Sequence, residues 1–383
     1  MTLRVLLLNW RDLHHPEAGG AEKYIVTVAE GLAARGHEVT FRTAAYPGAV
    51  PKESLAGVRY LRRGGHYSIY PRSILSGRQG RYDVVVDVQN GVPFLSPLVT
   101  STPVVNLVHH VHREQWPVVF GPRSSRLGWW LESSLAPVVY RRSTYVAVSH
   151  STRRELVELG VDANRITLIH NGTDAVAQEG YERSIQPRVI VLGRLVPQKR
   201  VEIALDAVAA LRTRIPGLRV DVVGTGWWQP ELRDHAKALG IDELVTFHGH
   251  VSEAEKHRLL ARAWVHAMPS LKEGWGLVVV EAGVHGTPTV AFREAGGPAD
   301  SILHEQTGLL VDEAMPQDGR LAYVAALERL LTVEDDRNRM SGEVRKWVSQ
   351  FHWEDCVAAW EELLIREARD EPSGSRVRER RRG

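Results

Sequence analysis

The sequence predicts an α/β protein in which two series of βαβ units follow one another. Short apolar runs, typical of buried parallel strands, alternate with helical patterns along most of the chain. The 383 residues are more than one ordinary hydrophobic core needs, and they suit two domains. Residues 175–187 are polar and show no periodicity, so we expect the boundary between the two domains there.

The composition is that of a globular protein, with 43% hydrophobic and 25% charged residues. The formal net charge of +2 gives no reason to expect nucleic acid as a partner. Cys356 is the sole cysteine, which excludes an internal disulfide framework and fits a reducing, cytoplasmic location. No run of 18 or more apolar residues is present, so no transmembrane span is expected. The N-terminal apolar run is too short for a signal peptide, and we assign it to the first buried strand.

The first series carries turn glycines and a histidine at predicted strand ends. Gly19 and Gly20 follow the first strand and precede a helix expected over residues 21–35. Such a turn lets the backbone approach a ligand at the carboxyl edge of the sheet, although a plain βα turn is the alternative. The apolar run 103–108 ends at His109, which we therefore expect to face the ligand crevice.

Other segments of this series are less specific. Residues 59–81 are basic and aromatic, and a solvated loop is the favoured interpretation, with contact to an anionic acceptor or a membrane surface as the alternative. The apolar segments 116–120 and 129–131 are assigned to packing, again with acceptor or membrane contact as the weaker interpretation. A helix is expected over residues 153–159, capped by Ser151 or Thr152. Further strands are expected over residues 38–41, 83–88, 145–149 and 165–169.

The second series begins with a strand over residues 188–193, and two cations follow it. Arg194 can make a forked contact to phosphate and Lys199 supplies a compact charge, although solvated loop charges are the alternative. Gly224 opens a Gly-Thr-Gly turn, but Gln229 stands where a dinucleotide fingerprint needs glycine, which disfavours a nicotinamide cofactor. Residues 317–369 are predicted to be helical with a break near His352, and residues 371–383 to form a disordered basic tail.

The most informative stretch holds two carboxylates, Glu273 and Glu281, around a Gly-Trp-Gly turn. The turn should place Glu273 on a loop and start a buried helix at Leu277 that ends near Gly286. A helix N-terminus favours an anion, whereas carboxylates accept hydrogen bonds from sugar hydroxyls. The stretch therefore predicts one ligand that contains both phosphate and sugar, a nucleotide-sugar.

In this order and context, these motifs resemble the retaining family 4 glycosyltransferases of the GT-B fold. The resemblance rests on the E-x7-E signature, on Gly193-Arg194 with Lys199, on the Gly19-Gly20 turn, on His109, and on the turns at Ser149 and Asn171-Gly172. It covers nearly the whole chain. It implies two facing Rossmann-like domains with parallel sheets and an interdomain cleft. The implied boundaries are 1–175 for an acceptor domain, 176–350 for a donor domain, 351–370 for a helix that crosses back, and 371–383 for the tail.

The resemblance also implies roles for single residues. Arg194 and Lys199 would neutralise the donor diphosphate, Glu281 would accept ribose hydroxyls, and Glu273 would face the donor sugar. His109 would hydrogen-bond that sugar near the reacting carbon. The remaining implied donor contacts are Gly19, Gly20, Gly224, Gly274, Trp275, Gly276, Leu277, and His250 and Val251 of the base-binding turn 248–251. Two positions depart from the family pattern: Trp275 stands where Phe is usual, and His170 precedes Asn171 where Pro is usual.

The implied reaction is transfer of a hexosyl group, with retention, from a UDP- or GDP-sugar to an acceptor hydroxyl. Polysaccharides, glycolipids and natural products are all candidate acceptors. We expect no cofactor and no metal ion, because Arg194, Lys199 and the helix N-terminus supply the charge that stabilises the leaving diphosphate. A sugar-nucleotide epimerase or phosphorylase of the same fold and an inactive nucleotide-sugar binding protein remain alternatives. Peripheral contact with the inner membrane face, through the basic and aromatic surface of the first domain, also stays open.

Overall fold

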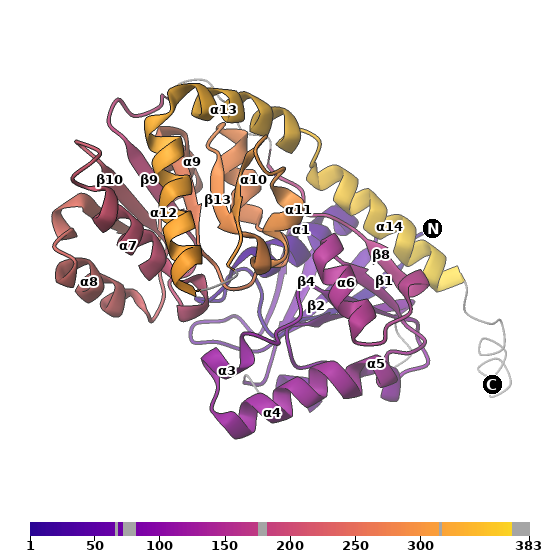
Figure 1. The fold of residues 1–383 in the computed structure, drawn as a ribbon. Helices are drawn as coiled ribbons and strands as arrows, with labels where there is room; N and C mark the ends of the chain where they lie inside the picture. The colour runs from indigo at the N-terminus through magenta and orange to yellow at the C-terminus, as the bar shows by residue number, and fades with distance from the viewer. Residues whose placement is uncertain (66–67, 72–81, 175–181, 314–315, 370–383) are drawn as a thin grey trace, which may run out of the picture.

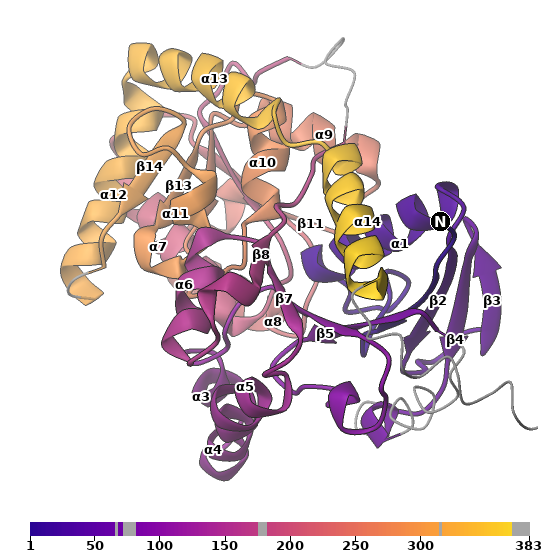
Figure 2. The same ribbon diagram turned by 90° about the vertical axis from the view of Figure 1, so that its right-hand side faces the viewer.

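The computed structural model describes residues 1–65, 68–71, 82–174, 182–313 and 316–369. These residues form two sheets with helices around each, and the sheets lie side by side in Figures 1 and 2. The first sheet has eight strands in the order β3-β4-β2-β1-β5-β6-β7-β8, and the second has six in the order β11-β10-β9-β12-β13-β14. All neighbouring strands are parallel except β3 and β4. The α/β prediction with two mainly parallel sheets is confirmed.

The first sheet is built on long apolar runs. The strands are β1 (Arg4–Leu8), β2 (Glu38–Thr43), β3 (Lys52–Leu55), β4 (Val58–Arg62), β5 (Val84–Gln89), β6 (Val104–Val108), β7 (Thr144–Ala147) and β8 (Ile166–Leu168). The helices are α1 (Gly20–Ala34), α3 (Trp116–Val119), α4 (Pro122–Trp130), a π-helical turn (Leu131–Leu135), α5 (Ala136–Val139) and α6 (His150–Glu158). Every residue of β5 and β6 is buried, as expected for central parallel strands covered on both faces.

The second sheet follows the same plan. Its strands are β9 (Arg188–Leu192), β10 (Arg219–Val223), β11 (Val245–Gly249), β12 (Val265–Met268), β13 (Thr289–Phe292) and β14 (Gly308–Val311). Its helices are α7 (Val201–Leu211), α8 (Gln229–Ala238), α9 (Glu253–Arg262), α10 (Leu277–Val284), α11 (Pro298–Ser301), α12 (Pro316–Thr332) and α13 (Glu334–Val348). The carboxyl ends of β9, β10 and β12 lead into the loops that carry the candidate donor residues.

The last helix, α14 (Trp353–Arg369), leaves the second sheet and packs against α1 and β5 of the first sheet. Both views show α14 beside α1. Trp360 is fully buried there and donates its indole N–H to the hydroxyl of Tyr24 over 2.7 Å. The C-terminal segment therefore ties the two sheets together.

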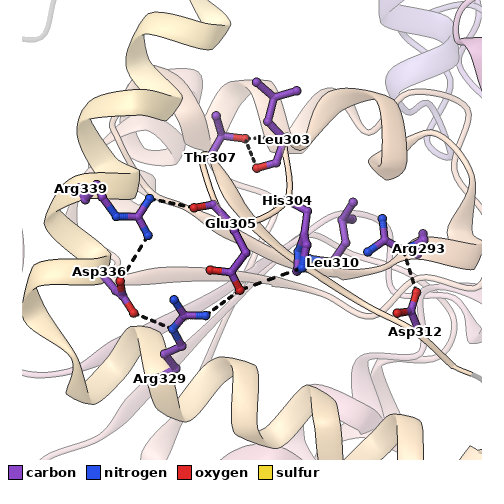
Figure 3. Close-up of polar contacts among 10 residues, drawn as sticks. All are labelled: Arg293, Leu303, His304, Glu305, Thr307, Leu310, Asp312, Arg329, Asp336 and Arg339. Carbon is purple, nitrogen blue, oxygen red and sulfur yellow. Dashed lines mark hydrogen bonds and ion pairs between the residues drawn. The ribbon is translucent and has the colours of Figure 1, made fainter.

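An ion-pair cluster fixes the outer edge of the second sheet (Figure 3). Arg329 of α12 contacts Glu305 at 2.7 Å and Asp336 of α13 at 2.6 Å, while Arg339 donates to the Glu305 carbonyl over 2.8 Å. Glu305 has a φ of 65°, and these contacts hold it in that left-handed conformation. The cluster therefore joins the turn before β14 to both following helices.

Two local predictions were wrong, and a third was incomplete. Residues 59–62 belong to β4 rather than to a loop, and Arg62 is buried in ion pairs with Asp12 and Glu53. Residues 66–67 and 72–81 of the same stretch, and the predicted tail, lie outside the described residues. The cap of α6 is Ser149, whose hydroxyl accepts the Thr152 N–H, so neither Ser151 nor Thr152 caps the helix. The C-terminal helical region has the expected break near His352, and a second one at Val333. None of the described helices combines the length and apolarity that crossing a bilayer requires.

Candidate active site

Two helix N-termini, one from each half of the chain, meet at the centre of the molecule. α1 begins at Gly20 and α10 at Leu277, and a Cβ placed on Gly20 would lie 3.7 Å from the Leu277 Cβ. Each helix follows a glycine N-cap that offers no capping side chain. The amides of both first turns therefore concentrate partial positive charge between the sheets, where an anion is favoured.

Arg194 adds a full positive charge at the same place. Its guanidinium donates to the Glu17 carbonyl over 3.5 Å, and a Cβ on Gly19 would approach its Nε to 3.3 Å. Within the described residues it has no carboxylate partner at ion-pair distance. Arg11 donates to the same Glu17 carbonyl over 2.8 Å. Burial lowers the pKa of Arg11, and the neighbouring charge of Arg194 acts in the same direction. The guanidinium groups of Arg11 and Arg194 thus lie close together, and of the two only Arg11 is paired with a carboxylate of the described residues.

The first carboxylate of the signature lies beside the second predicted cation. Lys199, at the end of the 3₁₀ turn Pro197–Lys199, reaches the Glu273 carboxylate at 2.5 Å. The Glu273 backbone is held on both sides, since its N–H donates to the Ala295 carbonyl and its carbonyl accepts the Gly297 N–H. As predicted, Glu273 lies outside helix and strand, except for an isolated bridge to Gly296. The structure therefore brings Lys199 and Glu273 together.

His109 and Gly274 bring the two halves into direct contact. A Cβ on Gly274 would lie 2.4 Å from the His109 carbonyl oxygen, so only glycine allows this approach. The His109 side chain is buried, and burial lowers its pKa to about 3, with His112 contributing, so the ring is neutral near pH 7. Its Nε2 atom has no hydrogen-bond partner among the described residues. A buried polar atom of this kind calls for a partner, which a bound ligand would supply.

The second carboxylate, Glu281, lies in the second turn of α10 and is held by two lysines. Lys256 of α9 contacts its Oε1 at 2.9 Å, and Lys23 of α1 contacts the same oxygen at 3.5 Å. Lys23 also pairs with Asp174 at 2.6 Å. The carboxylate is therefore oriented by one ammonium group from each half of the molecule.

Comparisons with known proteins place this geometry in a family. Residues 18–177 match the family described as Glycosyltransferase Family 4, and residues 177–347 match the family described as Glycosyl transferases group 1. The two matches adjoin and span most of the chain.

The chain belongs to the family 4 glycosyltransferases. It is a retaining hexosyltransferase that uses a nucleotide-sugar donor, as the resemblance predicts.

Relatives of this glycosyltransferase act in different settings. The GDP-mannose-dependent alpha-(1-6)-phosphatidylinositol monomannoside mannosyltransferase of Mycobacterium tuberculosis is 28% identical, over 94% of this chain and 98% of the relative. The glycogen synthase of the same species is 25% identical over 96% of both chains. Among solved structures, sucrose-phosphate synthase from Thermosynechococcus elongatus superposes with a TM-score of 0.78 at 20% identity, over 95% of this chain and 98% of that one. WaaG, a glycosyltransferase involved in lipopolysaccharide biosynthesis, superposes with a TM-score of 0.75 at 16% identity, over 94% and 99%. The GT-B fold is thereby confirmed.

Several predicted donor contacts of the glycosyltransferase have structural tasks. The Trp275 side chain is buried, with its ring 4.5 Å from that of His170 and 5.2 Å from that of Phe351 between centroids. It belongs to the core around α14, so its ring supports the Glu273 loop from behind. Gly224 donates its N–H to Gly249 and packs against Gly193, where a Cβ would meet the carbonyl oxygen at 1.9 Å.

The predicted base-binding turn after β11 is divided in role. His248 bonds Asp221 at 2.8 Å, and this contact engages its imidazole inside the second half. His250 is exposed, whereas Val251 packs partly against Ile190 and Leu259. Of the predicted turn, His250 therefore has the side chain most open to a ligand.

Residue patterns missed four charged side chains that build the site. Arg11, Lys23 and Lys256 fall in no motif, and Lys272, which pairs with Glu155 across the two halves, was given no role. For two of these residues, their place in the sequence gave a weak indication of a role in the site. Arg11 comes shortly after the end of β1, and Lys23 stands one helical turn after Gly20, so both lie near the carboxyl edge of the first sheet.

Proposed function

We propose that the second half of the chain, residues 176–350, binds the nucleotide-sugar and that the first half, residues 1–175, receives the acceptor. Arg194 and Lys199 bind the diphosphate together with the N-terminal amides of α1 and α10. Glu281 accepts the ribose hydroxyls, while Glu273 and His109 contact the transferred sugar. The single observation that carries this assignment is the half-buried Arg194, which has no carboxylate partner in the part of the chain that the structure describes and lies beside Arg11 and two helix N-termini.

The proposed chemistry follows from that placement. The anomeric C–O bond to the diphosphate breaks while the acceptor oxygen bonds the same face of the sugar, and the leaving phosphate oxygen takes the acceptor proton. Arg194 and Lys199 stabilise the charge that develops on the diphosphate. Neutral His109 hydrogen-bonds the sugar, because its buried Nε2 has no partner among the described residues. Glu273 favours the oxocarbenium-like transition state by its charge and forms no bond to the sugar.

We further propose a cytoplasmic setting, in which the single buried Cys356 stays reduced. The acceptor hydroxyl is carried by a molecule met at the inner membrane face. The support is an apolar surface of the first half, described below, and the phosphatidylinositol monomannoside named for one relative is of this lipid class.

Thermal unfolding in the presence of UDP-, GDP-, ADP- and dTDP-sugars tests donor binding. A donor at a hundred times its Kd should stabilise the fold by about 2.7 kcal/mol. The configuration of the new glycosidic bond is then read by NMR with the donor that binds.

Arg194→Ala should lower kcat/KM, and the loss should correspond to about 2–4 kcal/mol of transition-state stabilisation. Arg214→Ala is the matched control, because Arg214 is an exposed arginine of the same half that pairs with Glu328 away from the cleft. Unchanged kcat/KM in Arg194→Ala would rule out the role assigned to Arg194.

A further inference from the structure

We propose that one face of the first half docks on a membrane surface rich in anionic lipids. This docking face is formed by the outward side chains of the segment from α3 to α5, namely Val118, Val119, Phe120, Leu127, Trp130 and Val138. In Figures 1 and 2 α3 and α4 lie at the rim of the molecule, on the side opposite α13. The inference rests on the proposed function only in that the acceptor would be met at this surface.

The inward side of the segment is fully used for packing. Trp116 lies beneath Gly128 of α4, where a Cβ would meet the indole ring at 2.3 Å. Its indole N–H donates to the buried Glu132 over 2.8 Å, and His112 reaches the other oxygen of that carboxylate at 2.8 Å. Ser125 donates its hydroxyl to the Trp116 carbonyl over 2.8 Å. These contacts hold α3 against α4. Phe120 takes part in this packing, with its ring centroid 5.3 Å from that of Trp116, and it still leaves 41% of its surface exposed.

Six large apolar side chains are exposed on the outward side. Leu127, Trp130 and Val138 are 58%, 51% and 61% exposed, and their spacing of three and eight residues keeps them on one side of the helix. Val118, Val119 and Phe120 of the adjoining turn are 44%, 45% and 41% exposed. These six make up a large share of the exposed large hydrophobic side chains in the part of the chain that the structure describes. Such a concentration marks an interaction surface.

Charge identifies the occupant as an anionic lipid surface. The exposed charged side chains on the same segment and its two flanks are Arg113, Arg123, Arg126, Glu114, Arg141 and Arg142. Arginines thus outnumber the one exposed carboxylate, since Glu132 is buried beneath the helix. An apolar stripe with tryptophan, bordered by basic side chains, is the pattern of a helix that lies in the plane of a bilayer interface. A basic border attracts anionic headgroups electrostatically.

One end of the docking face lies beside a loop of the candidate active site. α3 contacts the 3₁₀ turn Pro197–Lys199 of the second half, and Lys199 is the residue paired with Glu273. A bilayer bound along α3 and α4 therefore lies beside the donor-binding loop. An acceptor that is anchored in the bilayer would meet the cleft without leaving the membrane.

Co-sedimentation with vesicles tests the proposal on the full chain. Vesicles of phosphatidylcholine mixed with phosphatidylglycerol should bind the wild type, and vesicles of phosphatidylcholine alone should bind it at least about tenfold less. The double variant Leu127→Glu/Trp130→Glu should lose binding to the anionic vesicles. Leu321→Glu/Ile185→Glu is the matched control, because those side chains are 70% and 97% exposed in the second half. Arg123→Gln/Arg126→Gln should weaken binding about 25-fold, at roughly fivefold per arginine, and should flatten its salt dependence.

Two further measurements keep the outcome clear. Nucleotide-induced stabilisation shows that each variant is folded, and it tests the donor site independently of vesicles. The proposal is overturned if the wild type fails to bind anionic vesicles, or if Leu127→Glu/Trp130→Glu binds them like the wild type. It is also overturned if sedimentation velocity shows a dimer that this double variant separates, because the face would then belong to a second copy of the chain.

Discussion

Adding one methyl group at Gly274 should separate the two halves of the active site. The new Cβ would lie 2.4 Å from the His109 carbonyl oxygen and 3.0 Å from its carbon, whereas ordinary contacts start near 3.4 Å. To remove this steric clash, the Glu273 loop and His109 must move apart by about 1 Å. The His109 carbonyl cannot turn away freely, because it accepts the Thr152 hydroxyl over 2.8 Å. A misplacement of about 1 Å is enough to lower a rate about a hundredfold, or about 2.7 kcal/mol.

The assay for Gly274→Ala is release of the nucleoside diphosphate from the donor, with kcat and donor KM measured separately. We expect kcat to fall about a hundredfold, while calorimetric binding of the free nucleoside diphosphate weakens less, because Arg194, Lys199, Glu281 and the α10 amides stay in one half and only the α1 amides move away. Gly342→Ala is the control, since a Cβ there meets nothing within 4 Å. The reasoning fails if Gly274→Ala keeps kcat within about threefold of the wild type at unchanged thermal stability.

Three further predictions follow from single contacts. Lys256→Met should raise the donor KM about tenfold, which corresponds to about 1.4 kcal/mol of binding free energy, with little change in kcat. The reason is that Glu281 loses the ammonium group that orients it. Lys256→Arg should recover most of the loss in the same steady-state assay. Lys199→Ala should weaken donor binding more than the double variant Lys199→Ala/Glu273→Gln does, because the single variant leaves an unpaired carboxylate beside the diphosphate. A double-mutant cycle that shows strict additivity in donor binding would contradict this. Burial lowers the pKa of His266 from 6.5 to about 3, so the unfolded chain takes up a proton at a higher pH than the folded chain does. As the pH drops below 6.5, this residue should therefore lower the free energy of unfolding by about 1.4 kcal/mol per pH unit. His266→Gln should make the free energy of unfolding, measured by urea titration at several pH values, depend less steeply on pH.

Local patterns predicted the elements and motifs whose cause is local. The apolar run at β5 is buried at every position, and the Gly-Trp-Gly turn starts α10 at Leu277 as its glycines indicate. The α6 cap was misplaced because Ser149 was assigned to the preceding strand, although its extended backbone is what an N-cap requires. At Ser149 the end of a strand pattern and the start of a helix pattern overlap.

Contacts between distant segments were beyond such patterns. Lys23 and Glu281 are 258 positions apart, and they meet only because α1 and α10 face each other. The predicted contact of Trp275 with the donor rested on its place in the motif, but the direction of its ring depends on the junction of α13 and α14, where it packs against Phe351. Residue type and spacing identify which groups occur near a strand end, while packing between elements decides which way each one points.

The two predicted phosphate cations are not equivalent, and the reason lies in their partners. Arg194 has no ion-pair partner among the described residues, so its charge is available to an incoming diphosphate without the loss of an ion pair. Lys199 is already bound to Glu273, and a diphosphate must share that ammonium group with the carboxylate. Sharing is possible because an ammonium carries three donors, and it has a consequence for specificity. When the diphosphate draws Lys199 toward itself, Glu273 gains capacity to accept hydrogen bonds from the sugar. Diphosphate binding therefore prepares the carboxylate that contacts the sugar, which favours an intact nucleotide-sugar over a free sugar at this site.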